Sequence, residues 1–208
     1  MMEPKSLLEA SQTFDRSGRA EAFVSLLLFG GLRISELRGL RREDLDLRRG
    51  RVIVRQRADK WQQIGAVKSK NSRRAVPLPN HTVQAMKRWL VASPHSTLNL
   101  VFPNGAGNVE SYANIYNRLW CPLMKASRLA RTTKRARGIE RIEPQFGIHA
   151  LRHAAVSLWI EQGATPKKVT TWAGHASIQF TMDTYGHLWD DPAGDSTITS
   201  GMERSILS

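Results

Sequence analysis

The chain has 208 residues, of which 41% are hydrophobic, so we expect one domain with a sizeable buried core. Its apolar runs fall short of the roughly 18 residues that a membrane-spanning helix needs, so we expect a cytoplasmic protein without a membrane partner. Its single cysteine, Cys121, excludes an intramolecular disulfide and a multi-cysteine metal site. The 31 Lys and Arg residues against 18 Asp and Glu residues give a net charge of +13, and the clustering of the arginines favours a nucleic-acid partner over a cationic surface without a ligand.

The first third of the chain predicts two helices and a small sheet. Residues 1–18 are polar and weakly patterned, and we interpret them as a remnant helix or linker. Residues 19–29 are apolar enough for a buried helix that ends at Gly30-Gly31, and a second short helix follows. The β-branched residues at 51–56, 64–67 and 74–78 then predict a three-stranded antiparallel sheet, with residues 68–72 as a polar hairpin turn.

The remainder of the chain predicts helices. We expect them at about residues 81–92, 110–126 and 148–162, the first of them capped by Asn80, and two short ones that begin at Thr165-Pro166 and at Ser177 and end near residues 174 and 185. Residues 127–144 are basic and lack a periodic pattern, so a loop is predicted there. The fold class is therefore α+β, mostly helical, with the small sheet in the N-terminal third.

Two early segments carry candidate chemistry. Arg33 follows the double glycine, where the backbone can turn sharply, and Glu36 lies on the same helix face, where its carboxylate can hold the guanidinium. Lys68 stands on the predicted hairpin turn, from which a lysine can reach into a groove and donate a proton. Each feature alone is more typical of an ordinary surface pair or a solvated basic turn.

A later helix gathers two histidines and an arginine. His149, Arg152 and His153 share one helix face, where imidazole and guanidinium can grip a phosphodiester and move protons. Zinc binding by His149 and His153 is a rival interpretation, which the absence of a glutamate between them disfavours. For His153 a packed core histidine is the alternative, because the neighbouring residues Ala154 and Leu158 are apolar.

The last candidate segment contains Gly174-His175 and, at the end of the final predicted helix, Tyr185. A tyrosine in such a place usually packs or makes a surface hydrogen bond.

The order of the four segments along the chain is stronger evidence than any one of them. GGLRISELRGL, VKSKNSRRAVPLP, HALRH and WAGHASIQFTMDTYGH together resemble the first-arginine box, lysine hairpin, second box and His-plus-tyrosine box of the tyrosine recombinases, the phage integrase family. The resemblance runs from about residue 20 to about residue 189.

This resemblance implies a tyrosine-recombinase catalytic domain that cleaves and rejoins DNA strands. Arg33 and Arg152 would clamp the scissile phosphate, and Tyr185 would attack phosphorus to give a 3′-phosphotyrosyl link and a free 5′-hydroxyl. Lys68 would be the general acid for the leaving oxygen, although Lys70 competes for that role. The covalent link conserves the phosphodiester energy, so the resemblance implies no metal, no ATP and no other cofactor.

The remaining boxes imply supporting roles. His149 would assist proton transfer at the nucleophile, His175 would donate a hydrogen bond to the phosphate, and Glu36 would support the site without reacting. His153 is interpreted as a structural residue beside them. We expect further DNA contacts from basic residues of the hairpin and of the predicted loop, namely Lys70, Arg73, Arg74, Arg128, Arg131, Lys134 and Arg135.

The resemblance also bears on organisation and partners. We expect a linker at 1–18, the catalytic domain at 19–189 and a tail at 190–208, and either a catalytic fragment or a naturally short member, because the family usually carries a helical DNA-binding domain ahead of the first arginine box. The implied partners are double-stranded DNA and three further copies in a homotetramer on that DNA. The implied role is site-specific recombination or DNA integration for a phage or other mobile element. A catalytically silent DNA-binding relative and a type IB topoisomerase-like enzyme are the alternatives.

Overall fold

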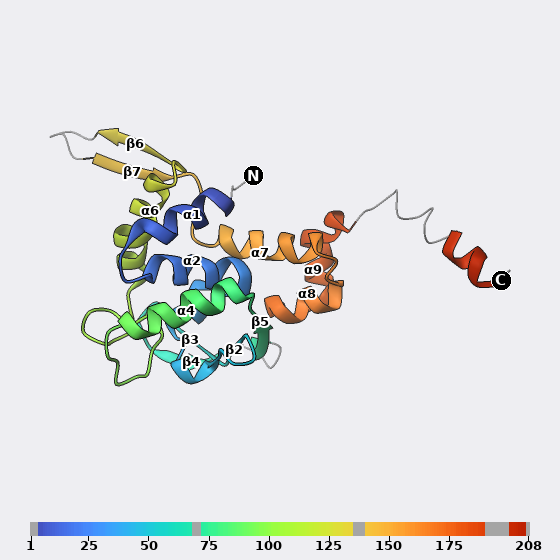
Figure 1. Cartoon of the computed structure of the whole chain (residues 1–208), viewed down its shortest axis with the longest axis horizontal. Helices are drawn as coiled ribbons and strands as arrows, with labels where there is room; N and C mark the ends of the chain where they lie inside the picture. The colour runs from blue at the N-terminus through green and yellow to red at the C-terminus, as the bar shows by residue number, and fades with distance from the viewer. Residues whose placement is uncertain (1–3, 68–71, 135–139, 190–199, 207–208) are drawn as a thin grey trace.

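The computed structural model describes residues 4–67, 72–134, 140–189 and 200–206. Its α-helices form a body in which α1, α2 and α4 lie side by side, with α7, α8 and α9 at one end (Figure 1). The helices are α1 (Pro4–Phe14), α2 (Arg19–Gly30), α3 (Ile34–Arg38), α4 (Asn80–Ala92), α5 (Tyr112–Asn114), α6 (Cys121–Ala126), α7 (Ala150–Glu161), α8 (Pro166–Ala173) and α9 (Ile178–Tyr185). A π-helical stretch, Ile115–Trp120, joins α5 to α6, and short 3₁₀ turns lie at Arg42–Asp44 and Gly186–Leu188.

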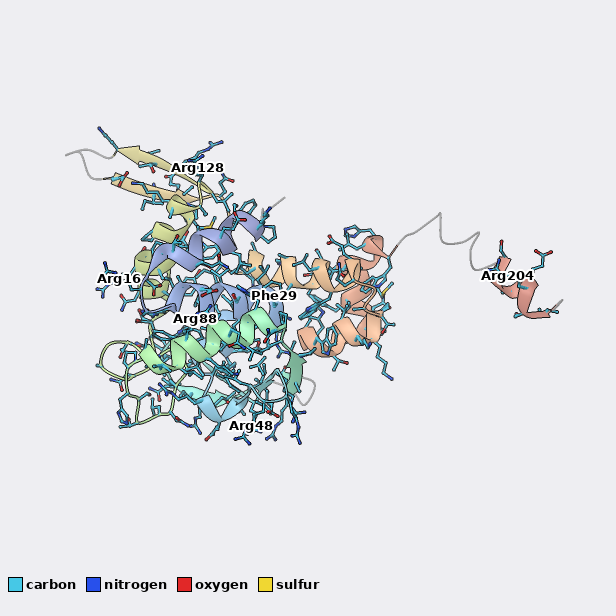
Figure 2. The ribbon with its side chains drawn as sticks, viewed as in Figure 1. Arg16, Phe29, Arg48, Arg88, Arg128 and Arg204 are labelled. Carbon is cyan, nitrogen blue, oxygen red and sulfur yellow. The ribbon has the colours of Figure 1, made fainter. Side chains whose placement is uncertain are left out.

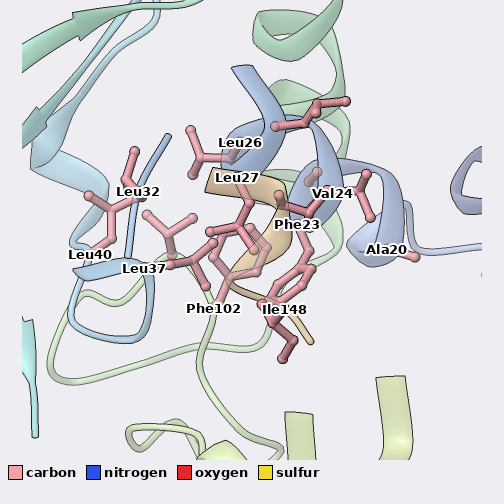
Figure 3. Close-up of a cluster of buried hydrophobic side chains, with 14 of the residues drawn as sticks. Ala20, Phe23, Val24, Leu26, Leu27, Leu32, Leu37, Leu40, Phe102 and Ile148 are labelled. Atoms are coloured by element: carbon pink, nitrogen blue, oxygen red, sulfur yellow. The ribbon is translucent and has the colours of Figure 1, made fainter. Parts of the chain in front are cut away.

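The core is built around α2, which contacts α1, α4 and α7. Apolar residues occupy most positions of α2, and this helix is buried on most of its circumference. Figure 3 shows its side chains meeting those of the segments that follow it, and the ring of Phe23 meets the ring of Phe102 edge-on at 6.1 Å. Among the described residues no helix has the length and apolar character that a membrane span requires.

The predicted three-stranded antiparallel sheet is present, but one of its strands differs. It consists of β1 (Leu45–Asp46), β2 (Arg51–Val54) and β5 (Arg74–Pro77), in the order β1-β2-β5. The predicted strand at 64–67 is β4 (Ile64–Ala66), which instead pairs with β3 (Gln56–Ala58) in a separate hairpin.

The hairpin leaves the sheet because of contacts with the end of α3. The side-chain amide of Gln56 donates to the carbonyl oxygen of Gly39 at 2.6 Å. The backbone of Arg57 lies so close to Gly39 that an added Cβ there would stand 2.7 Å from it. These contacts bind β3 to α3 and carry it away from β5, so Ile64–Ala66 becomes its strand partner.

The loop predicted at 127–144 is wrong, because β6 (Ala130–Lys134) and β7 (Glu140–Pro144) form an antiparallel hairpin there. The two strands lack alternating apolar residues, which is why the sequence pattern missed them. Opposite charges face each other across the hairpin instead, as at Arg131 with Glu143 and Lys134 with Glu140. The hairpin projects from the body at the end away from α8 and α9 (Figure 1).

The other predicted helices are confirmed, with small shifts at their ends. Thr165 and Ser177 cap α8 and α9 through their side-chain oxygens, as expected. Asn80 does not cap α4, because Pro79 holds the N-cap position and Asn80 is the first helical residue, whose side chain accepts from Gln84 at 3.3 Å. The turn predicted at 68–72 lies outside the described residues except for Ser72, and the helical segment 200–206 stands apart from the body in Figure 1.

Gly31→Ala should destabilise the fold by about 2–4 kcal/mol. Gly31 has a φ of 58°, which penalises a side chain, and an added Cβ would lie 2.5 Å from the indole of Trp159. Urea denaturation followed by circular dichroism measures the loss.

Two matched variants separate the two causes. Gly163 has a φ of 78°, and the space around an added Cβ is open, so Gly163→Ala should lower the free energy of unfolding by about 1 kcal/mol. Gly105→Ala has open space and no positive φ, so its stability should match that of the parent chain. Equal losses for Gly31→Ala and Gly163→Ala would show that the Trp159 contact contributes nothing.

Candidate functional site

The candidate site is organised around the carboxylate of Glu36, which is 2% exposed. Arg33 precedes α3 at its N-cap position, so its backbone N–H donates to Glu36 Oε2 at 2.8 Å and its guanidinium donates to Oε1 at 2.9 Å. The sequence expectation that Glu36 holds Arg33 therefore matches the geometry.

A second guanidinium binds the same carboxylate from β5. Arg74 donates through Nη1 and Nη2 to the two oxygens of Glu36, at 2.9 and 2.8 Å, and through Nε to the carbonyl oxygen of Trp172 at 2.6 Å. Burial alone raises the pKa of Glu36, but the hydrogen bonds and charge of Arg74, together with Arg33, outweigh it and leave this pKa below its ordinary value. Glu36 is therefore ionised at neutral pH.

The expectation that Arg74 contacts DNA is wrong, because its side chain is only 1% exposed and its donors are occupied within the protein. Its position on β5 explains this, since alternate residues of a strand point the same way and Arg74 shares the inward face with Val76. That alternation, visible in the sequence, was the signal that could have identified Arg74 as a buried partner of an acidic residue. Arg73 faces solvent, as expected.

Arg152 approaches the same region from α7. It is 4% exposed, and its Nη1 and Nη2 donate to the carbonyl oxygens of Gly31 and Ala173 at 2.6 and 2.5 Å. Arg33 donates to the adjacent carbonyl of Gly174 at 3.1 Å. Burial and then the charge of Arg33 lower the pKa of Arg152 to about 9, so the structure places two guanidiniums close enough to repel each other.

The carbonyls that these arginines grip belong to the end of α8. Gly174 ends that helix with a φ of 65°, and an added Cβ would stand 2.8 Å from Nη1 of Arg74, so both conformation and space favour glycine. His175 follows, 5% exposed, with its Nδ1 2.9 Å from Oγ1 of Thr181. Burial, and then the charges of Arg152 and Arg33, lower the pKa of His175 to about 4, so it is neutral at pH 7.

Tyr185 lies at the end of α9 and is 7% exposed. Its ring is parallel to that of His175, with centroids 6.2 Å apart, and its hydroxyl oxygen lies 2.6 Å from Nδ1 of His153. Burial raises the pKa of Tyr185, and the charge of Arg152 opposes that rise without cancelling it. The phenol is therefore protonated at neutral pH.

The structure places the two histidines of HALRH side by side. His153 is exposed and bonds the Tyr185 hydroxyl, so the interpretation of it as a packed core histidine is wrong. His149 is exposed too, and its ring meets the ring of His153 edge-on at 5.0 Å. Burial, the neighbouring His153 and Arg152 lower the pKa of His149.

The other candidates lie around or away from this cluster. Lys68, Lys70 and Arg135 are outside the described residues. A hollow of about 300 Å³ beside Arg33 is lined by Val67 and Ser72, which flank the predicted lysine turn, and by Arg57, a basic residue absent from the expected site. Within the described ranges no group of three or more His, Cys, Asp or Glu residues could hold a metal ion.

The remaining basic candidates do not join the cluster. Arg128, Arg131 and Lys134 are exposed on or beside the β6–β7 hairpin, at the far end of the body from α8 and α9. Figure 2 shows Arg128 beside the hairpin and Arg48 at the opposite edge of the same view, so positive charge is spread over much of the surface.

The chain is similar to known proteins in sequence and in fold. The model of the phage integrase family matches residues 2–191. Tyrosine recombinase XerC of Xanthomonas campestris pv. campestris (strain B100) is 30% identical over 170 residues, which cover 82% of this chain and 44% of that protein. The transposase from transposon Tn916 of Enterococcus faecalis is 29% identical over 181 residues, which cover 82% and 42%. The chain thus spans less than half the length of these curated relatives.

Two solved structures share the fold. The Tn1549 transposon integrase (residues 82–397, in complex with circular intermediate DNA) superposes with a TM-score of 0.71 at 23% identity, over 96% of this chain and 64% of that one. The catalytic domain of bacteriophage HP1 integrase superposes with a TM-score of 0.59 at 16% identity, over 96% and 92%. The predicted fold class is confirmed.

Arg74→Ala should destabilise the protein by about 3 kcal/mol, because it removes the bidentate partner of a buried carboxylate. The adjacent Arg73→Ala, on the exposed face of the same strand, should change stability by less than about 0.5 kcal/mol. Urea denaturation of both variants measures the difference. A loss below about 1 kcal/mol for Arg74→Ala would mean that Arg33 alone suffices to hold Glu36.

Proposed function

The chain belongs to the phage integrase family, and from this premise we propose that it is the catalytic domain of a site-specific DNA recombinase. It cleaves and rejoins DNA strands through a 3′-phosphotyrosyl intermediate and serves a phage or other mobile element. The observation that carries the proposal is the convergence of Arg33, Arg152, His175 and Tyr185, from four different segments, in one cluster beside the carbonyl oxygens that end α8.

The two arginines bind the scissile phosphate. Arg33 and Arg152 are held by carbonyl oxygens and by Glu36, so their orientation is set before DNA arrives. Their mutual repulsion, which contributes to the lowered pKa of Arg152, is relieved when an anion lies between them. The same charges stabilise the additional negative charge of the pentacoordinate transition state.

Tyr185 attacks phosphorus, so an Oη–P bond forms and the bond between phosphorus and the 5′-oxygen breaks. Lys68 protonates the departing 5′-oxygen, His149 assists proton transfer at the nucleophile, and the neutral His175 donates a hydrogen bond to the phosphate. The 5′-hydroxyl of a partner strand then attacks the phosphotyrosine and restores the phosphodiester. The energy of the original bond is conserved throughout, so the reaction uses neither a metal nor ATP.

Double-stranded DNA is the proposed partner, and the protein acts on it in the cytoplasm. Net charge of +13 supports this, as do the exposed side chains of Arg73, Arg128, Arg131 and Lys134. Lys70 and Arg135 complete the proposed set of contacts. Arg74 is excluded from it, because Glu36 and Trp172 occupy its donors.

A homotetramer on DNA is the proposed assembly. An apolar hollow of about 420 Å³ opens beside α7, lined by residues that include Phe146, Ala154 and Leu158. The helical segment 200–206 exposes Met202 (58%) and Ile206 (76%). We propose that this segment of one protomer docks into the hollow of the next and links neighbouring active sites.

Tyr185→Phe should form no covalent adduct with a nicked suicide DNA substrate, because the attacking oxygen is gone, whereas Tyr112→Phe, at an exposed tyrosine, should form it normally.

Arg152→Ala should reduce cleavage by at least about 10²-fold while weakening DNA binding much less. Denaturing gels measure the adduct and mobility shifts measure binding. An adduct with Tyr185→Phe would disprove the nucleophile, and equal losses of cleavage and binding would make Arg152 a binding residue.

Ile206→Asp should prevent assembly of the tetramer on full recombination-site DNA while leaving adduct formation on a single half-site unchanged. The reason is that a carboxylate cannot enter an apolar hollow without a partner. Sedimentation of the protein–DNA complex measures the assembly, with Arg204→Ala in the same exposed segment as the control. An undisturbed tetramer with Ile206→Asp would contradict docking through this segment.

A further inference from the structure

His153 makes a hydrogen bond with the hydroxyl of Tyr185. The distance from Nδ1 to the hydroxyl oxygen is 2.6 Å, a short hydrogen bond for this pair of atoms. His149 contacts His153, with the two rings edge-on at 5.0 Å. The resemblance gives the proton-transfer role to His149, but in this geometry His153 is better placed to take a proton from Tyr185.

We propose that His153 is a catalytic base that accepts the phenolic proton of Tyr185 as the tyrosine attacks DNA. This inference rests on the proposed function, and it assigns one further residue to that reaction. In the tautomer that carries its proton on Nε2, His153 accepts at Nδ1 the hydrogen bond that the Tyr185 hydroxyl donates.

The step balances without any further reactant. The phenolic O–H bond breaks as the Oη–P bond forms, and the proton passes to Nδ1 of His153, which becomes an imidazolium. The bond from phosphorus to the 5′-oxygen breaks, and that oxygen receives a separate proton from the general acid. In the rejoining step His153 returns its proton to the phenolate oxygen that departs from phosphorus.

The surroundings of the hydroxyl require an acceptor. Tyr185 is 7% exposed, and burial raises its pKa, so the phenol does not ionise readily by itself. His175 is poorly placed to help, because its Nδ1 bonds Oγ1 of Thr181 and its ring lies parallel to the phenol with an angle of 6° between the planes.

His153 also has a route by which its proton can exchange. Its side chain is exposed, whereas His175 is 5% exposed. Arg152, one position earlier on α7, points inward to the carbonyls of Gly31 and Ala173. Two adjacent residues of α7 therefore have different roles: Arg152 binds the phosphate and His153 contacts the nucleophile.

The test compares two substitutions at this position in single-turnover cleavage of a nicked suicide substrate. His153→Phe removes the hydrogen bond and the base, and His153→Gln keeps a hydrogen-bonding group but cannot take up a proton. Both should slow adduct formation by about 10²-fold or more. Gln162→Ala, an exposed change directly after the same helix, should cleave at the parent rate, and circular dichroism checks that all the variants are folded.

A second substrate separates the two ends of the reaction. A 5′-bridging phosphorothiolate supplies a leaving group that needs no general acid, so it should restore cleavage by Lys68→Ala but not by His153→Phe or His153→Gln. Rescue of the His153 variants would place this residue at the leaving group and overturn the proposal.

The remaining outcomes are equally decisive. A His153→Gln variant as fast as the parent would reduce His153 to a positioning residue and overturn its role as a base, as would a His153→Phe variant at the parent rate. If the parent chain itself formed no adduct, the proposed function would be wrong. That outcome does not depend on the His153 variants.

Discussion

A carboxylate that is almost wholly removed from water is the constraint on which the rest of this structure depends. Glu36 remains ionised because guanidiniums from two different elements neutralise it, Arg33 at the start of α3 and Arg74 on β5. Without these partners the burial of the charge would cost several kcal/mol. Arg74 in turn bonds the carbonyl oxygen of Trp172, so one buried charge ties the first helices, the sheet and α8 together. The candidate site is assembled where these three parts meet.

This arrangement leaves an excess of positive charge in the cluster of Arg33, Arg74 and Arg152 around Glu36. Glu36 is shared between two arginines, and Arg152 adds a third guanidinium whose hydrogen bonds go to neutral carbonyls. Burial is the main reason why the pKa values of Arg152 and His175 are lowered, and the charge of the neighbouring arginines lowers both further. An anion beside these guanidiniums would reduce their mutual repulsion. The proposed role of the protein in DNA strand exchange gives that anion a chemical identity, the scissile phosphate.

The sequence predicted most of the fold, and its errors have definite causes. Helices with strong local signals, such as those capped by Thr165 and Ser177, lie where they were expected. The pattern does not predict the β6–β7 hairpin because its strands, ARTTK and ERIEP, carry mostly polar and charged residues and lack an alternating apolar face. The strand at Ile64–Ala66 was placed in the wrong sheet because its partner is drawn away by Gly39. Both errors concern which segments pair, a choice that depends on contacts between distant parts of the chain.

The candidate site divides in the same way. The sequence by itself determined which reactive groups the chain possesses and their order, since Arg33, His149, Arg152, His175 and Tyr185 stand in recognisable local motifs. Tertiary structure alone decided that Arg74 turns inward to Glu36 and that His153 meets the hydroxyl of Tyr185. The physical reason is that each of these hydrogen bonds joins residues more than thirty positions apart, and local spacing carries no information on how two distant elements pack.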